Sequence, residues 1–148
     1  MQKLSKKSLL FLCIGNSCRS QMAEGFARHY YGNQFDIQSA GLRESKLDPL
    51  ALEVMKEISI DISNQFSKST DYFKDRDFDF VITVCEEGAK ECPYFKANIA
   101  NLHKPFRDPP KITKDLVYDD KLSIYREVRD EIREFVSKEL ISCINCCT

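Results

Sequence analysis

Leu9-Leu-Phe-Leu-Cys-Ile14, followed by Gly15-Asn-Ser-Cys-Arg-Ser20, is the most informative stretch of this 148-residue chain. A continuous apolar run that ends at a glycine is typical of a strand buried on both faces of a sheet. After the loop, apolar residues recur with the i, i+3, i+4, i+7 spacing of one helix face: Ala23, Phe26, Ala27 and Tyr30. The stretch is therefore predicted to form a strand, a short loop and a helix.

The rest of the chain repeats this alternation. Further strands are predicted at residues 35–40, 78–85 and 98–106. One helix is expected to begin at Asp48-Pro49, which offers an N-cap and a proline in the first turn, and another to span residues 123–140. Alternating strands and helices predict an α/β fold, a four-stranded parallel sheet flanked by helices on both faces. We expect one domain with its core at residues 8–140.

Composition excludes several classes of protein. The net charge is −1, so no basic field indicates nucleic acid, and no apolar run is long enough to cross a membrane. Lys3, Lys6 and Lys7 precede an apolar run that is too short for a signal peptide and lacks a cleavage site. We therefore expect a cytoplasmic protein. Its seven cysteines then indicate catalysis, redox exchange or metal binding rather than structural disulfides.

The loop between the first strand and the first helix has the composition of an anion site. Backbone N–H groups of residues 14–19 (Ile14, Gly15, Asn16, Ser17, Cys18 and Arg19) can point inward at a helix N-terminus, where a tetrahedral oxyanion binds well. The Arg19 guanidinium can hold two of its oxygens. The same positive surroundings favour a Cys13 thiolate, and Ser20 is placed to donate a hydrogen bond to it. Cys18 is expected to be a packing residue.

Leu12 to Gly25, Leu-Cys-Ile-Gly-Asn-Ser-Cys-Arg-Ser-Gln-Met-Ala-Glu-Gly, resembles the thioredoxin-coupled arsenate reductases, which share the fold of low-molecular-weight protein tyrosine phosphatases. The resemblance covers about residues 8 to 140. It continues through Ser39-Ala-Gly41, Met55-Lys-Glu57, Asp61-Ile-Ser-Asn64, residues 85–93, Asp108-Pro109 and Val128-Arg-Asp-Glu-Ile132.

The resemblance implies a relay of three cysteines in arsenic detoxification. Cys13 attacks arsenate, Cys85 attacks Cys13 as arsenite leaves, and Cys92 takes over the disulfide, which thioredoxin reduces. Asp108 matches the family's general acid. No cofactor is expected, and the protein is expected to be a monomer. The segment Glu86–Glu91 has to be mobile: if residues 86–92 formed a helical turn, Cys92 would lie about 10 Å from Cys85, beyond the roughly 7 Å that a disulfide allows.

A tyrosine phosphatase is the main alternative, because Cys13, Arg19 and Asp108 would serve it equally well. Three features favour the reductase. The first is the pair Cys85 and Cys92, which a hydrolase does not need. The second is Pro110, where a tyrosine phosphatase would place an aromatic residue. The third is the reductase form of the loop, which has Ser17 and Gln21. Residual phosphatase activity is compatible with this prediction.

A metal-binding or thiol-sensing protein is the alternative from another class. It rests on the tail, Cys143-Ile-Asn-Cys146-Cys147. His29 and His103 are isolated in sequence and more typical of surface or packing histidines. We therefore expect no metal site, and the tail is expected to be a frayed terminus with three accessible thiols.

One position departs from the family. Some of these reductases hold a potassium ion at positions that match Asn16, Glu24 and Ser39, but the fourth matching position, an Asp, is Lys68 here. An ammonium group has no lone pair with which to bind a cation. Lys68 is therefore expected either to pair with Glu24 in place of the ion or to point into solvent.

Overall fold

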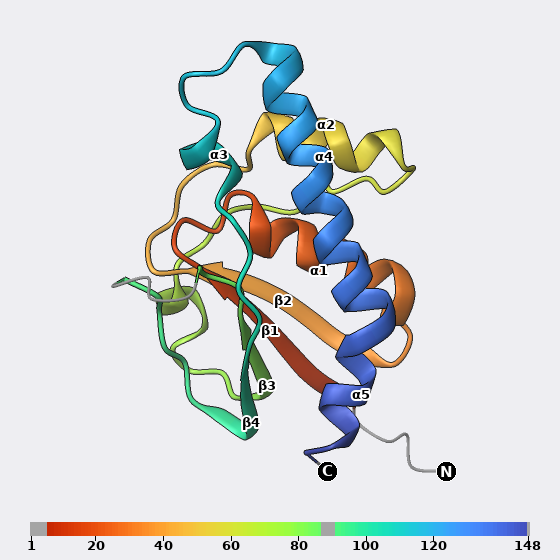
Figure 1. The fold of residues 1–148 in the computed structure, drawn as a ribbon. Helices are drawn as coiled ribbons and strands as arrows, with labels where there is room; N and C mark the ends of the chain where they lie inside the picture. Colours follow the sequence, from red (N-terminus) through yellow and green to blue (C-terminus); the bar gives the residue numbers. More distant parts are fainter. Residues whose placement is uncertain (1–5, 87–90, 148) are drawn as a thin grey trace.

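A computed structural model describes residues 6–86 and 91–147 and contains a four-stranded parallel sheet with strand order β2-β1-β3-β4 (Figure 1). The strands are β1 (Lys7–Cys13), β2 (Phe35–Gly41), β3 (Phe78–Thr83) and β4 (Ala97–His103). The predicted fold class is confirmed. The fourth strand ends three residues earlier than predicted, at His103.

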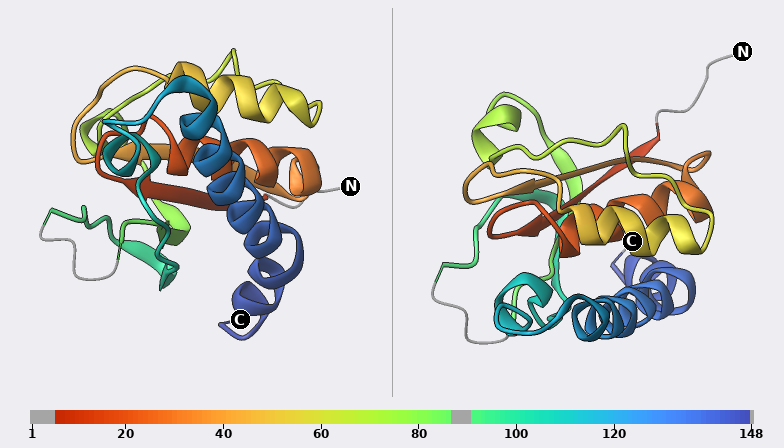
Figure 2. Two further views of the ribbon diagram at one scale, coloured as in Figure 1. Left: turned by 45° about the horizontal axis from the view of Figure 1, so that its top comes forward. Right: turned by 90° about the horizontal axis from the view of Figure 1, so that it is seen from above.

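The helices lie mainly over one face of this sheet (Figure 2). They are α1 (Arg19–Tyr31), α2 (Pro49–Glu57), α4 (Tyr118–Glu134), the π-helical turn η2 (Phe135–Glu139) and α5 (Leu140–Asn145). The second face is covered by the 3-10 helix η1 (Thr70–Phe73). A short helix, α3 (Pro109–Ile112), follows Asp108 and was not predicted. No helix in the described part of the chain is long and apolar enough to cross a bilayer.

The prediction of a frayed tail is wrong for residues up to Asn145, which are helical. The final helix begins earlier than predicted, at Tyr118, and helical structure continues through α5 because Leu140 and Ile144 are buried against the core. Burial of one apolar stripe stabilises a terminal helix more than its intrinsic propensity does.

Strand β1 lies at the centre of the sheet and contributes to both layers of the core. Leu9 and Phe11 pack under the long helices, whereas Leu10 and Leu12 pack with Phe73 on the other face. All four of these β1 side chains are fully buried. The apolar run that the sequence shows is explained by this position, since a central parallel strand has no solvent-facing side.

Backbone hydrogen bonds from the residues that follow β2 and β3 hold the start of the loop after β1 in place. Leu42 N donates to Cys13 O at 3.3 Å, Arg43 N to Ile14 O at 3.1 Å, and Val84 N to Leu12 O at 2.8 Å. At the end of β2 the backbone of Gly41 lies against the loop. A Cβ added there would lie 2.6 Å from Ile14 O and 2.8 Å from Asn16 N. Only glycine allows the two segments to approach this closely.

Gly41→Ala is expected to lower the free energy of unfolding by about 1–3 kcal/mol, because the added methyl group meets backbone atoms that cannot turn aside. Gly15→Ala is the matched control. Its Cβ would meet only Ser45 Cβ at 3.8 Å and Ser17 Oγ at 3.9 Å, so a change below about 1 kcal/mol is expected. Urea denaturation of both variants measures the difference. Equal stabilities would contradict the close approach.

Candidate active site

The loop Cys13–Ser20 wraps around a small pocket at the carboxyl end of β1. The pocket has a volume of about 170 Å³ and is lined by Cys13, Ile14, Gly15, Ser17, Cys18, Arg19, Asp108 and Pro110. The structure thus brings together most of the predicted site residues. No aromatic side chain is among these lining residues, as expected from Pro110.

Ser20 reaches the candidate nucleophile, as predicted. Its Oγ lies 2.8 Å from Cys13 Sγ, and both side chains are buried. Asn16 Nδ2 donates to the same Ser20 Oγ at 2.8 Å. Because the Ser20 oxygen accepts from Asn16, its single hydrogen is free to point at the Cys13 sulfur.

Asn16 holds the middle of the loop in a left-handed backbone conformation, with φ at 48°. Its Nδ2 also donates to Ser39 Oγ at 2.9 Å, and its Oδ1 accepts from the backbone N–H of Lys68 at 2.9 Å. Asparagine tolerates this conformation better than most residues. The buried hydrogen bonds explain why the loop keeps it.

Two glutamines and a serine brace the loop from outside. Gln21 Nε2 donates to Asn16 O at 3.0 Å and to Phe66 O at 3.0 Å, and Gln65 Nε2 donates to Gln21 Oε1 at 2.9 Å. Ser67 Oγ donates to Gly15 O at 3.0 Å. The sequence suggested Gln21 only as a family feature. Gln65 and Ser67 were missed, because nothing in their local pattern shows that residues 65–67 run beside the loop.

Arg19 and Asp108 form the polar wall of the pocket. Arg19 is buried, and its guanidinium donates to Phe106 O at 3.2 Å and lies 3.4 Å from Asp108 Oδ2. The backbone N–H of Asp108 donates to Glu86 Oε1 at 3.1 Å. The arginine is thus held with its charge at the pocket, and the Asp108 carboxyl lines the same space.

Cys18 is a packing residue, as predicted. It is buried in the main core, and burial raises the pKa of its thiol, with the nearby Asp48 carboxylate acting in the same direction. Asp48 caps α2 through Leu50 N at 3.0 Å and accepts from Tyr125 Oη at 2.6 Å. Its backbone N–H donates to Ser17 O at 2.9 Å. Asp48 therefore fastens the loop to both α2 and α4.

Cys85 and Cys92 lie beside one another and near the loop. Cys85 is fully buried two residues beyond β3, and Cys92 is half-buried against the same core. Burial raises the pKa of the Cys85 thiol above its usual range, and the neighbouring Cys92 and Cys13 thiols raise it further. Neither Glu86 nor Cys92 is helical, and the Cys92 side chain is already within hydrogen-bond distance of Cys85. Residues 87–90 of the segment expected to be mobile lie outside the described residues.

The tail cysteines lie far from this pocket. Figure 1 shows the C-terminal end near the start of β1, whereas the loop follows the end of that strand. Cys143 is half-buried, while Cys146 and Cys147 are exposed, as expected. Within the described residues no group of three or more His, Cys, Asp or Glu side chains could hold a metal ion. His103 contacts Thr83 Oγ1 at 2.6 Å, and His29 packs edge-on to Tyr30.

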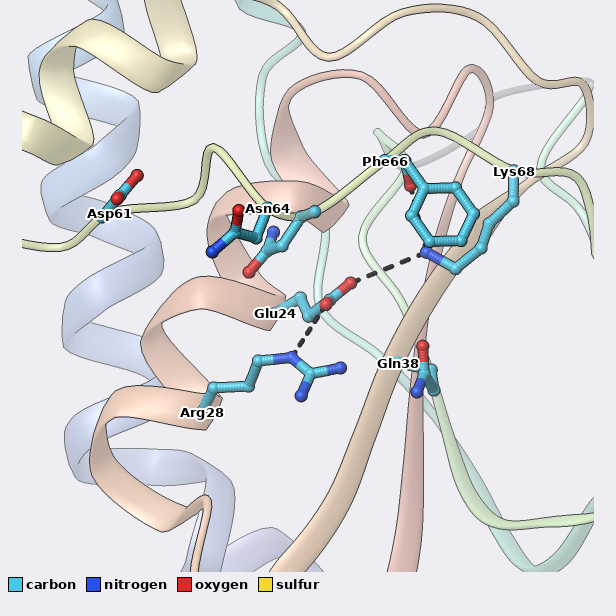
Figure 3. Close-up of a pocket in the computed structure, with 8 residues that line it drawn as sticks. Glu24, Arg28, Gln38, Asp61, Asn64, Phe66 and Lys68 are labelled. Atoms are coloured by element: carbon cyan, nitrogen blue, oxygen red, sulfur yellow. Dashed lines mark hydrogen bonds and ion pairs between the residues drawn. The ribbon is translucent and has the colours of Figure 1, made fainter.

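Lys68 does not point into solvent. Its ammonium lies 3.9 Å from Glu24 Oε1, with 3% of each side chain exposed, and Figure 3 shows both groups meeting in one pocket. Of the two alternatives for this position, the ion pair with Glu24 is therefore the one that the structure contains.

The fold and the site together resemble one known family. The family model described as low molecular weight phosphotyrosine protein phosphatase matches residues 8–144. The chain belongs to this family. Its relatives within the family include an arsenate reductase of Halalkalibacterium halodurans, 43% identical over 129 residues that cover 87% of this chain and 91% of that one.

Solved structures agree with this placement. An arsenate reductase in a phosphate-binding state aligns with a TM-score of 0.74 at 33% identity, covering 96% of this chain and 99% of that one. A thioredoxin-dependent arsenate reductase of Corynebacterium glutamicum aligns with a TM-score of 0.59 at 27% identity, covering 93% of this chain and 63% of that one.

Ser20→Ala is expected to slow alkylation of Cys13 by iodoacetamide at least about tenfold, because one hydrogen bond to the thiolate is lost. Peptide mass spectrometry follows each cysteine separately. The exposed Cys146 serves as an internal control whose rate should not change. Unchanged alkylation of Cys13 would show that Ser20 does not stabilise the reactive form.

Proposed function

We propose that this protein is an arsenate reductase that uses Cys13, Cys85 and Cys92 in sequence and is regenerated by thioredoxin. The observation that carries the proposal is the placement of three thiols at one anion loop. Cys13 lines the pocket, Cys85 is buried behind it and Cys92 lies beside Cys85. A hydrolase has a use for the first thiol only. The arsenate reductases among the relatives support the same conclusion.

In the first step arsenate binds within the loop and Cys13 attacks arsenic. The Arg19 guanidinium and the backbone N–H groups of the loop balance the charge of the anion. One arsenate oxygen departs as water after protonation, leaving a Cys13–arsenic bond with arsenic still pentavalent. Asp108 lines the pocket next to Arg19 and is the group placed to supply that proton.

In the second step the Cys85 thiolate attacks the Cys13 sulfur. The sulfur–arsenic bond breaks, its two electrons stay with arsenic, and trivalent arsenite departs as the Cys13–Cys85 disulfide forms. Cys92 then attacks Cys85 and releases the Cys13 thiolate. Each exchange requires direct approach of the attacking sulfur, and the position of Cys92 beside Cys85 satisfies this. A dithiol such as thioredoxin reduces the final Cys85–Cys92 disulfide.

The same pocket would accept a phosphate monoester, so slow phosphatase activity is compatible with the proposal. Pro110 lines the pocket, and no aromatic side chain is among the described lining residues to hold a substrate ring. Hydrolysis of aryl phosphates is therefore expected to be weak.

Cys13→Ser is expected to abolish arsenate reduction, because no other thiol lines the pocket except the packed Cys18. Cys85→Ala and Cys92→Ala should each prevent multiple turnover, since the relay has no bypass. NADPH consumption with arsenate, thioredoxin and thioredoxin reductase measures turnover.

The triple variant Cys143→Ser, Cys146→Ser, Cys147→Ser is the control. These thiols lie at the other end of the sheet, so wild-type turnover is expected. Sustained turnover by Cys92→Ala would contradict the proposed last step, and loss of that turnover in the combined variant would assign it to the tail.

The rate of arsenite release in a single turnover should rise with pH between 7 and 9. Burial raises the pKa of Cys85, so its thiol form dominates at neutral pH and its reactive thiolate increases about tenfold per pH unit. Rapid-quench measurement of arsenite with the Cys92→Ala variant, at saturating arsenate, isolates this step. A rate independent of pH would show that Cys85 deprotonation does not limit it.

A further inference from the structure

We infer that Lys68 is a positioning residue for Cys13: its ammonium group acts as an internal cation that fixes Glu24, and through Glu24 the hydrogen bonds of the anion loop. The pair lies in a pocket of about 330 Å³ on the outer side of the loop (Figure 3). The inference rests on the proposed function in taking Cys13 as the nucleophile. It concerns how this nucleophile is held.

The ammonium group of Lys68 has few partners besides Glu24. It donates to Phe66 O at 3.1 Å and lies 4.6 Å from the centre of the Phe66 ring and 5.9 Å from that of Phe73. Burial lowers the pKa of Lys68, Glu24 acts in the opposite direction, and Arg28 lowers it further. A buried charge needs an opposite charge nearby, and Glu24 favours the charged form of Lys68.

The two oxygens of Glu24 have separate cations. Oε2 accepts from Arg28 Nε at 2.8 Å, and Arg28 is half-exposed. Oε1 faces Lys68 Nζ and accepts from Ser39 Oγ at 2.5 Å. Arg28 therefore cannot replace Lys68, because Lys68 balances the charge on the oxygen that holds Ser39.

The direction of the remaining hydrogen bonds follows from this contact. A serine hydroxyl has one hydrogen, and that of Ser39 points to Glu24. Ser39 must therefore accept from Asn16 Nδ2, whose other hydrogen is donated to Ser20. Ser20 in turn directs its hydrogen to Cys13 Sγ. A continuous chain thus connects the Lys68–Glu24 pair to the nucleophile.

The side chain of Lys68 can be tested apart from its backbone. The backbone N–H that donates to Asn16 Oδ1 remains after any substitution other than proline. Lys68→Ala therefore removes the ammonium group, opens space beside Glu24 and leaves the loop's main-chain contact in place.

The experiment measures alkylation of Cys13 by iodoacetamide and, separately, kcat and KM for arsenate. Lys68→Ala is expected to reduce both the alkylation rate and kcat about tenfold or more. Ammonium, methylammonium or potassium should restore them with saturation, because a small cation fits the vacated space. Tetraethylammonium at the same ionic strength should not. The wild-type protein should show no specific response to potassium.

Two matched variants define the result. Lys104→Ala removes a lysine that also pairs with a glutamate, at 3.5 Å from Glu139, and faces an aromatic ring, Phe135. Neither partner belongs to the hydrogen-bond chain that leads to Cys13, so wild-type rates are expected. Lys68→Ala combined with Glu24→Gln should not be rescued by any cation, because the anion is gone. Circular dichroism and thermal melting check that each variant folds.

Wild-type alkylation in Lys68→Ala, or equal rescue by tetraethylammonium, would overturn the inference. If Lys68→Ala does not fold, Lys68→Met keeps the volume without the charge, and wild-type alkylation in that variant would overturn it equally. The alkylation readout does not depend on arsenate. A wild-type protein that fails to reduce arsenate would refute the proposed function while leaving this test intact.

Discussion

The buried side-chain amide of Asn16 forms four hydrogen bonds, and these hold the anion loop in the shape that the rest of the site requires. Its two N–H groups reach Ser20 and Ser39, and its oxygen accepts from Lys68 N and Gln21 Nε2. These partners come from α1, from β2 and from the segment before η1. An unpaired buried polar group costs about 1–3 kcal/mol, so the loop geometry and the positions of these three segments stabilise one another.

The three thiols of the proposed relay differ in their burial and in the charges around them. Cys13 lines the anion pocket beside Arg19, Cys85 is fully buried, and Cys92 is half-buried next to a charged segment. Thiolates are the reactive species, and burial keeps Cys85 in its thiol form. Burial therefore disfavours early attack by Cys85, whereas Cys13 lines the pocket where the substrate binds and attacks first in the proposed relay. Exposure near Cys92 places the final disulfide where an external reductant can approach.

Much of this arrangement could be predicted from sequence because it is local. The strand, loop and helix around Cys13 have clear periodicities, and Cys85 follows a strand that is equally clear. Gln65 and Ser67 could not be identified, since they act through a segment without periodicity that folds back on the loop. The early start of α4 was missed because its first turn, with Asp119 and Asp120, is polar. Burial of Lys68 also runs against the usual exposure of lysine, so only the fold reveals its partner.

The difference between a phosphatase and a reductase on this fold reduces to what attacks the Cys13 adduct. In hydrolysis, water attacks the phosphorus of the adduct from the open side of the pocket. In the proposed reduction, a thiol attacks the sulfur from the side of the sheet. Here a thiol lies on that side, in the core behind the loop, where water has no access. Loop residues such as Arg19 and Ser20 serve both reactions, because both begin with a thiolate and a tetrahedral anion. The choice between hydrolysis and reduction therefore depends on residues outside the anion loop: Cys85, just after β3, and Cys92, at the end of the segment that follows.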